Sequence, residues 1–224
     1  TQFNEAADLE KYPRTPAKDV EMLFRVGNEV LFMPEVGEIY PEGEKVKANF
    51  DFGGLDQTME GRFRPGHFQG VAEVVSRLLK ILRPHRLYLG QKDFQQYVIV
   101  REMVRQLRLD VEVIRCPIVR EQNGLAMSSR NVRLTPAGRE RAGLIYRTLQ
   151  EARALSADHS PQEVKAHALQ SLRQPGLQPE YFEIVDAQTL RPVNRFDETE
   201  TVVACTAVRI GDVRLIDNLL LRGE

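Results

Sequence analysis

Short apolar runs alternate with helical apolar spacing over the first half of the chain. Apolar residues recur every three or four positions in residues 70–84 and again in 93–109, which predicts two amphipathic helices. Apolar runs at 86–90 and 110–119 predict strands. Strands that alternate with helices favour a parallel, doubly wound α/β sheet over residues 1–120.

Three further elements are predicted nearer the start of the chain. Thr15 can cap a helix, Pro16 suits its first position, and Gly27 can end it. The apolar run at 29–33 predicts a short buried strand, and residues 44–52 predict another.

After residue 131 the order of elements changes. Two long helices are predicted first, each preceded by a capping residue and a proline, and three strand-like runs follow. Gly211 and Asp212 separate the last two runs, and two residues of this type predict a β-hairpin. Helices followed by an antiparallel sheet make a separate α+β unit, so two domains are predicted, residues 1–120 and residues 121–224.

Composition narrows the classes of partner. The 224 residues are 42% hydrophobic, enough for a sizeable core, and the net charge is −1. A nearly neutral chain gives no bulk attraction to nucleic acid or to an anionic membrane. No apolar run reaches the length that spans a bilayer, and no signal peptide opens the sequence, so a cytoplasmic protein is expected.

The turn between the strand at 86–90 and the next helix carries candidate chemistry. Lys92 and Asp93 follow Gly90 where the helix begins, and free backbone N–H groups at such a start favour an anion. A lysine at this point suits a phosphate, although a solvated turn lysine beside a plain capping aspartate is the alternative. Gln95 and Gln96 lie in the first turn of the same helix, where one of them can hydrogen-bond a polar substrate.

A second set of donors lies near the boundary between the two predicted domains, where ligand sites are common. The sequence GLAMSSRN, residues 124–131, places two hydroxyls and a guanidinium side by side, a combination that fits phosphate oxygens. A capped, solvated linker is the alternative. Arg62, Arg64 and His67 surround a Pro-Gly turn and also suit an anion, or serve only structure. The sequence has no Walker loop, G-x-G-x-x-G motif, zinc site or Ser-His-Asp triad.

Several motifs together resemble those of the pantoate–β-alanine ligase family. In chain order they are TQF, DLEKYPRT, EIYPEG, RPGHFQGV, LGQKDFQQ, GLAMSSRN and RLIDN. The resemblance implies a Rossmann-like domain with a smaller C-terminal α+β domain. It also implies ligation of (R)-pantoate to β-alanine with ATP and Mg²⁺, through a pantoyl adenylate, with release of pyrophosphate and AMP. The expected protein is a cytoplasmic homodimer that binds small molecules and neither nucleic acid nor membrane.

The resemblance also assigns residues to ligands. The ATP-binding residues that it implies are Gly90, Gln91, Lys92, Asp93, Val119, Met127, Ser128, Ser129 and Arg130. Pantoate is expected at Gln2 and Gln96, and β-alanine at Gln2. The resemblance implies no protein side chain as a metal ligand.

Two departures from the family pattern qualify these expectations. Gln91 stands where the family usually has glutamate. The family's catalytic histidine lies in an HxGH motif on a first βαβ unit, and none of the four histidines here, His67, His85, His159 and His167, lies in such a motif. Residues 1–224 alone are therefore expected to be impaired. The alternatives are a non-catalytic or partner-dependent remnant of this enzyme, and another nucleotidyltransferase of the same fold.

Overall fold

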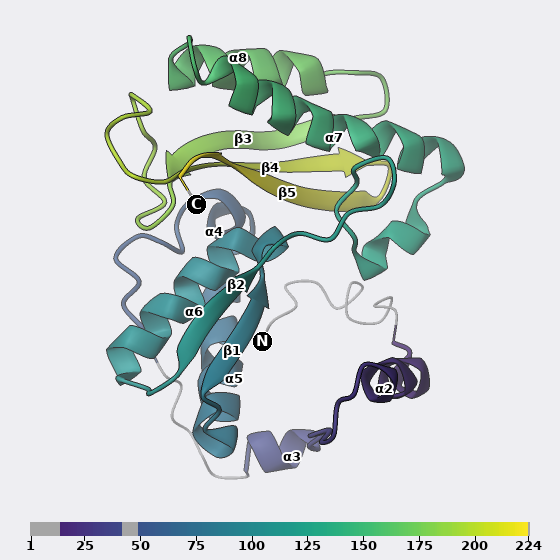
Figure 1. Ribbon diagram of the computed structural model, residues 1–224, viewed down its shortest axis with the longest axis vertical. Helices are drawn as coiled ribbons and strands as arrows, with labels where there is room; N and C mark the ends of the chain where they lie inside the picture. Colours follow the sequence, from purple (N-terminus) through teal and green to yellow (C-terminus); the bar gives the residue numbers. More distant parts are fainter. Residues whose placement is uncertain (1–13, 42–48, 224) are drawn as a thin grey trace.

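Two sheets organise the molecule in the computed structural model, which describes residues 14–41 and 49–223. A two-stranded parallel sheet lies in the N-terminal half and a three-stranded antiparallel sheet in the C-terminal half. Figure 1 shows the antiparallel sheet with two helices over one face, above the parallel sheet and its own helices. The predicted α/β fold with a second α+β unit is confirmed.

The parallel sheet pairs β1 (Arg86–Gly90) with β2 (Glu112–Cys116) in register along their whole length. Helix α6 (Phe94–Leu107) connects them after a short 3₁₀ turn, η1 (Gln91–Asp93). Helix α5 (His67–Leu82) precedes β1 and packs on α6. Buried side chains of both helices meet partly buried leucines and valines of the strands in one apolar cluster. All four elements were predicted, because each carries its own periodicity.

The first part of the described chain departs from prediction. Helix α2 (Pro16–Arg25) is confirmed, and a short helix α3 (Val36–Ile39) follows it. The predicted strand at 29–33 is wrong: these residues have no regular secondary structure and pair with no strand in the described ranges, and most of their side chains are exposed. An apolar run becomes a buried strand only where a ladder partner and a covering layer exist. Several large apolar side chains in the segment from α2 to α3 are exposed to solvent.

The strand predicted at 44–52 lies partly outside the described residues. Its described part, 49–52, is irregular backbone and not a strand. Phe50 and Phe52 are nevertheless buried and stack on each other with ring centroids 5.7 Å apart. Their apolar alternation came from burial in the α5–α6 cluster and not from sheet pairing. A short helix, α4 (Met59–Phe63), follows and leads to α5.

The C-terminal half matches the predicted order. Its elements are α7 (Pro136–Leu155), α8 (Pro161–Leu172), β3 (Gln178–Asp186), β4 (Val202–Ile210) and β5 (Val213–Arg222). Thr135 caps α7 by accepting a hydrogen bond from the Gly138 N–H. The hairpin between β4 and β5 turns at Gly211, whose φ of +56° is a conformation that favours glycine.

The two halves share buried surface. Met59, Phe94 and Val98 from the N-terminal half pack into one cluster with side chains of β3 and β4, among them Val185 and Val203. The antiparallel sheet therefore has α7 and α8 on one face and the N-terminal half on the other. The division near residue 120 stays a prediction, since the sheets are separate while the core is partly common.

Candidate functional site

A cavity of about 340 Å³ lies where the two halves meet. Its walls come from α4, η1, β3, the loop before α7, and the hairpin of β4 and β5. The polar and charged residues that line it are Glu60, Arg64, Lys92, Asp93, Ser128, Arg130, Arg133, Glu180, Arg209, Asp212, Arg214 and Asp217. Such a wall, rich in both charges, suits a polar and multiply charged ligand.

Lys92 reaches this cavity because β1 ends just before it. Gly90 closes the strand, η1 turns the chain, and α6 begins at Phe94. The Lys92 side chain is 21% exposed, and its Nζ lies 3.9 Å from Asp93 Oδ2. Asp93 occupies the position before α6, but its side chain makes no capping hydrogen bond. Its carboxylate is thus not consumed by the helix that it precedes.

The loop before α7 brings the second donor set to the same cavity. Ser128 begins a 3₁₀ helix, η2 (Ser129–Arg133), by accepting a hydrogen bond at 3.2 Å from the Arg130 N–H. Asn131 is buried beneath the loop and donates to the Ala126 carbonyl at 3.1 Å. Local bonds therefore give the loop a defined shape and place Ser128 and Arg130 on the cavity wall.

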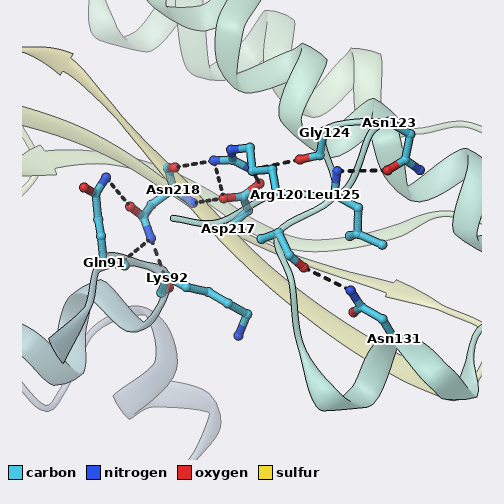
Figure 2. A network of polar contacts seen from close by, with 10 residues as sticks. Gln91, Lys92, Arg120, Asn123, Gly124, Leu125, Asn131, Asp217 and Asn218 are labelled. Atoms are coloured by element: carbon cyan, nitrogen blue, oxygen red, sulfur yellow. Dashed lines mark hydrogen bonds and ion pairs between the residues drawn. The ribbon is translucent and has the colours of Figure 1, made fainter. Parts of the chain in front are cut away.

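Two adjacent residues of β5 connect η1 to this loop, as Figure 2 shows. The Asn218 amide donates to the carbonyls of Gln91 at 2.8 Å and Lys92 at 3.0 Å. Asp217 accepts two hydrogen bonds from the Arg120 guanidinium, at 2.6 and 3.0 Å. Burial raises the pKa of Asp217, with the neighbouring Arg120 acting in the opposite direction.

A second buried network closes another wall. Arg214 donates two hydrogen bonds of 2.7 Å to Glu60, and the Tyr181 hydroxyl donates a third at 2.8 Å. Burial raises the pKa of Glu60, but the hydrogen bonds and charge of Arg214 outweigh it and hold that pKa below its ordinary value. Burial and the adjacent Glu60 charge raise the pKa of Tyr181 well above its ordinary value. Glu60 is therefore ionised and fully engaged with its partners.

The predicted ATP-binding residues divide into two groups. Lys92, Asp93, Ser128 and Arg130 line one cavity although they come from segments far apart in the sequence. The remaining five, which do not line it, are Gly90, Gln91, Val119, Met127 and Ser129. Gln91 instead donates to Asn218 Oδ1 at 3.1 Å, so its side chain holds η1 to β5.

The predicted pantoate residues lie near this cavity or outside the description. Gln96 lines a smaller adjoining hollow of about 30 Å³, which it shares with Lys92 and Asp93. Gln2 lies outside the described residues. Gln95 is buried, and it donates to the Leu55 and Thr58 carbonyls at 2.6 and 2.9 Å.

The three residues predicted in the turn at 62–68 lie in different places relative to these hollows. Arg64 lines both hollows, and His67 is buried at the edge of the smaller one, against Phe68. Arg62 is exposed and lines neither. The geometry leaves Arg64 as the member of this turn that faces a ligand.

Several residues of the site were not predicted. Glu60, Arg133 and Arg214 line the main cavity, and Arg120 and Asn218 support it. The motif RLIDN, residues 214–218, was noticed but had no assigned role. Its partners in the N-terminal half lie 97 to 154 positions away along the chain, so no local pattern points to them.

The described residues contain no group of three or more histidines, cysteines, aspartates or glutamates arranged to hold a metal ion. Among the helices described, none has the length and apolar character needed to cross a membrane.

The chain was compared with known proteins. The family model described as pantoate-beta-alanine ligase matches residues 1–220. A pantothenate synthetase from Bacteroides fragilis is 49% identical, over 98% of this chain and 77% of its own. One from Porphyromonas gingivalis is 47% identical, over 98% of this chain and 78% of its own.

Solved structures agree with these sequences. The crystal structure of pantothenate synthetase from Thermus thermophilus superposes with a TM-score of 0.93 at 41% identity, covering 99% of this chain and 80% of that one. A pantoate-beta-alanine ligase from Francisella tularensis, in complex with beta-gamma ATP and beta-alanine, gives a TM-score of 0.77 at 32% identity, covering 99% and 76%.

Proposed function

We propose, since this chain belongs to the pantoate–β-alanine ligase family, that the cavity between its halves is where ATP meets pantoate. Enzymes of this family join pantoate to β-alanine at the expense of ATP. The Francisella relative, whose structure holds an ATP compound and β-alanine, supports the same ligands for this chain. The proposal concerns how the residues described above divide the work.

The observation that carries the proposal is the meeting of two donor sets on one cavity. Lys92 comes from η1, and Ser128, Arg130 and Arg133 come from the loop and η2. Ammonium, guanidinium and hydroxyl groups that converge on one space fit the oxygens of a polyphosphate. We assign the ATP phosphates to this wall, and we keep Gly90, Gln91, Val119, Met127 and Ser129 as nucleotide contacts through backbone or surface.

The proposed reaction has two steps. The pantoate carboxylate, ionised at neutral pH, attacks the α-phosphorus of ATP, so that a pantoyl adenylate forms and pyrophosphate leaves. The amine of β-alanine then attacks the acyl carbon and AMP leaves. Holding both anions in line supplies as much as about 7–11 kcal/mol. Each fixed donor aimed at developing charge adds about 3–4 kcal/mol.

Gln96 is the proposed pantoate contact among the described residues. It borders the smaller hollow next to Lys92 and Asp93, so an acid held there lies beside the phosphate wall. An amide side chain supplies both a donor and an acceptor, which suits a hydroxy acid. Gln2 is retained in the proposal for pantoate and β-alanine.

Magnesium is part of the proposal, and the residues present fit an ion that binds mainly through substrate phosphates and water. Mg²⁺ usually keeps several waters and binds through one or two carboxylates plus substrate phosphates. Asp93 offers one such carboxylate at the cavity, and the described residues hold no larger acidic cluster. The ion would neutralise phosphate charge, and Asp93 would offer it a carboxylate.

The test is substrate dependence. We expect ATP–pyrophosphate exchange that requires pantoate and not β-alanine, and AMP release that requires all three substrates. Exchange without pantoate, or with an unrelated acid in its place, would favour another nucleotidyltransferase of this fold.

We also propose a homodimer in the cytoplasm, on the strength of the family resemblance. The exposed apolar side chains of α2 and of the segment that follows it, such as Phe24 and Met33, are compatible with burial against another chain. Analytical ultracentrifugation at several protein concentrations tests the assembly, and a sedimenting species of one chain at all of them would contradict it.

A further inference from the structure

We propose that Asp217 and Asn218 are positioning residues, which together fix the distance between the two donor sets of the site. This inference rests on the proposed function, since it concerns how Lys92 and the loop residues Ser128 and Arg130 stay in register. Both residues belong to β5, where Asn218 hydrogen-bonds the backbone of η1 and Asp217 hydrogen-bonds the Arg120 guanidinium.

Asn218 holds the η1 side. Its residue is 2% exposed, and all of its side-chain hydrogen bonds go to Gln91 or Lys92. Both amide hydrogens are used on consecutive backbone carbonyls of η1, at 2.8 and 3.0 Å. These two carbonyls lie on either side of the Lys92 Cα, so Asn218 sets where the Lys92 side chain starts.

Asp217 holds the loop side through Arg120. The guanidinium that Asp217 binds also donates to the Gly124 carbonyl at 3.0 Å and lies 3.7 Å from the centre of the Tyr146 ring. Arg120 pairs with Ala126 in a short antiparallel bridge, and Ala126 in turn accepts the Asn131 amide. The loop that carries Ser128 is thus built outward from the Arg120–Asp217 ion pair (Figure 2).

Because Asp217 and Asn218 are adjacent on β5, the η1 side and the loop side of the site are attached to the same strand. Asp217 and Asn218 pair with Thr206 and Cys205 of β4, and the Asn218 N–H donates to the Asp217 carboxylate at 2.8 Å. A hydrogen-bonded strand is stiff, so η1 and the loop keep a constant separation. A misplacement of about 1 Å between reacting groups costs about 100-fold in rate.

The first experiment replaces Asn218 with Ala in the active enzyme. We expect the rate of ATP–pyrophosphate exchange with pantoate to fall about 30- to 100-fold and ATP binding by calorimetry to weaken. Ser76→Ala on α5 is the matched control, since Ser76 is 3% exposed and its hydroxyl donates to the Glu73 carbonyl, away from both donor sets. The control should lose melting temperature but keep its rate at temperatures where it is folded.

A double-mutant cycle decides whether Asn218 acts through Lys92. If it does, Asn218→Ala should change the rate less than threefold in a Lys92→Ala background, while independent sites would combine multiplicatively. The same cycle between Asp217→Asn and Arg130→Ala tests the loop side. Full multiplicativity in both cycles would overturn the proposal. Asn218→Asp, which keeps the size and removes both donors, replaces the alanine variant if that does not fold.

A failure of the proposed function can be distinguished from a failure of the positioning role. If Lys92→Ala keeps its normal exchange rate, the phosphate role of Lys92 is wrong. If Lys92→Ala is slow while Asn218→Ala and Asn218→Asp are both normal, the phosphate role stands and the positioning role of Asn218 is wrong.

Discussion

Gln95 and Gln96 are neighbours on the first turn of α6, yet their side chains do different work. Gln95 is buried and bonded to the segment before α4, whereas Gln96 faces the hollow beside Lys92. We expect Gln96→Ala to raise the KM for pantoate at least tenfold, and that for ATP less than threefold, because a bond to one substrate is lost. Steady-state kinetics with each substrate varied in turn checks this, and equal rises would contradict it.

The matched variant is Gln95→Ala. It removes the Gln95 partner of the Glu60 N–H and of the Leu55 carbonyl, while the Thr58 carbonyl keeps its bond from the Gly61 N–H; each group left unsatisfied costs about 1–3 kcal/mol. We therefore expect a lower denaturation midpoint with a near-normal KM for pantoate. The sequence predicted one functional glutamine in this turn. Local pattern alone did not separate the two, since the partners of Gln95 at 55–60 lie far from the turn along the chain.

Lys92 gives the second residue-scale prediction. Lys92→Ala should lower adenylate formation by about 100- to 1000-fold, the effect of one fixed donor. Lys80→Ala, at the exposed end of α5, is the matched control and should leave the rate unchanged. Rapid-quench measurement of the adenylate is the assay, and melting curves of both variants should overlay that of the parent.

At the scale of elements, a capping residue predicts where a helix starts. How much that residue stabilises the helix depends on whether its side chain bonds the helix backbone. Ser160 and Glu163 form a reciprocal capping box at the start of α8, while the Thr15 hydroxyl at α2 makes no bond to the helix backbone. We expect Ser160→Ala to lower the free energy of unfolding by about 0.5–2 kcal/mol. Thr15→Ala should cost clearly less, and urea unfolding monitored by circular dichroism compares the two.

The elements that the sequence predicted correctly are those with local evidence. Periodicity located α5 and α6, and proline with a cap located α7 and α8. The strand predicted at 29–33 was wrong because apolar composition alone does not reveal whether a pairing edge is present. The loop at 124–131 was proposed to contact phosphate because of its donor residues, and this role stays a prediction; its support by β5 was not predicted.

At the scale of the whole molecule, Glu60 and Arg214 join the halves across 154 positions. The Glu60 pKa is lowered in the fold, so its ionised form stabilises the folded state above the unfolded pKa near 4.5, and this contribution is lost as pH falls through the folded pKa. Removing one partner of a buried pair costs about 3–5 kcal/mol. Glu60→Gln should therefore be less stable at pH 7 and show a flatter decline in stability below about pH 5 than the parent. Urea titrations at a series of pH values measure both, and an unchanged slope would contradict the assignment.

The fold class followed from the alternation of elements, but the contacts between halves did not. Glu60, Arg214, Asp217 and Asn218 are charged or polar residues in segments whose local pattern marks only a short helix or a strand. Their pairing depends on how two sheets meet, and this is a property of the three-dimensional arrangement. The sequence therefore predicted the donor residues of the proposed site, but it did not predict the residues of α4 and β5 that hold those donors in place.

Because a ribosome makes the chain from its N-terminus, the contact between Asn218 of β5 and Lys92 affects when the site can form during synthesis. Lys92 is held by Asn218, 126 positions later, so every proposed phosphate donor among the described residues leaves the ribosome before the strand that holds it. Contacts of such long sequence separation form late, because a large loop must close first. A nascent chain that ends before β5 should bind ATP no better than a Lys92 variant, and the site should appear only once β5 has joined β4.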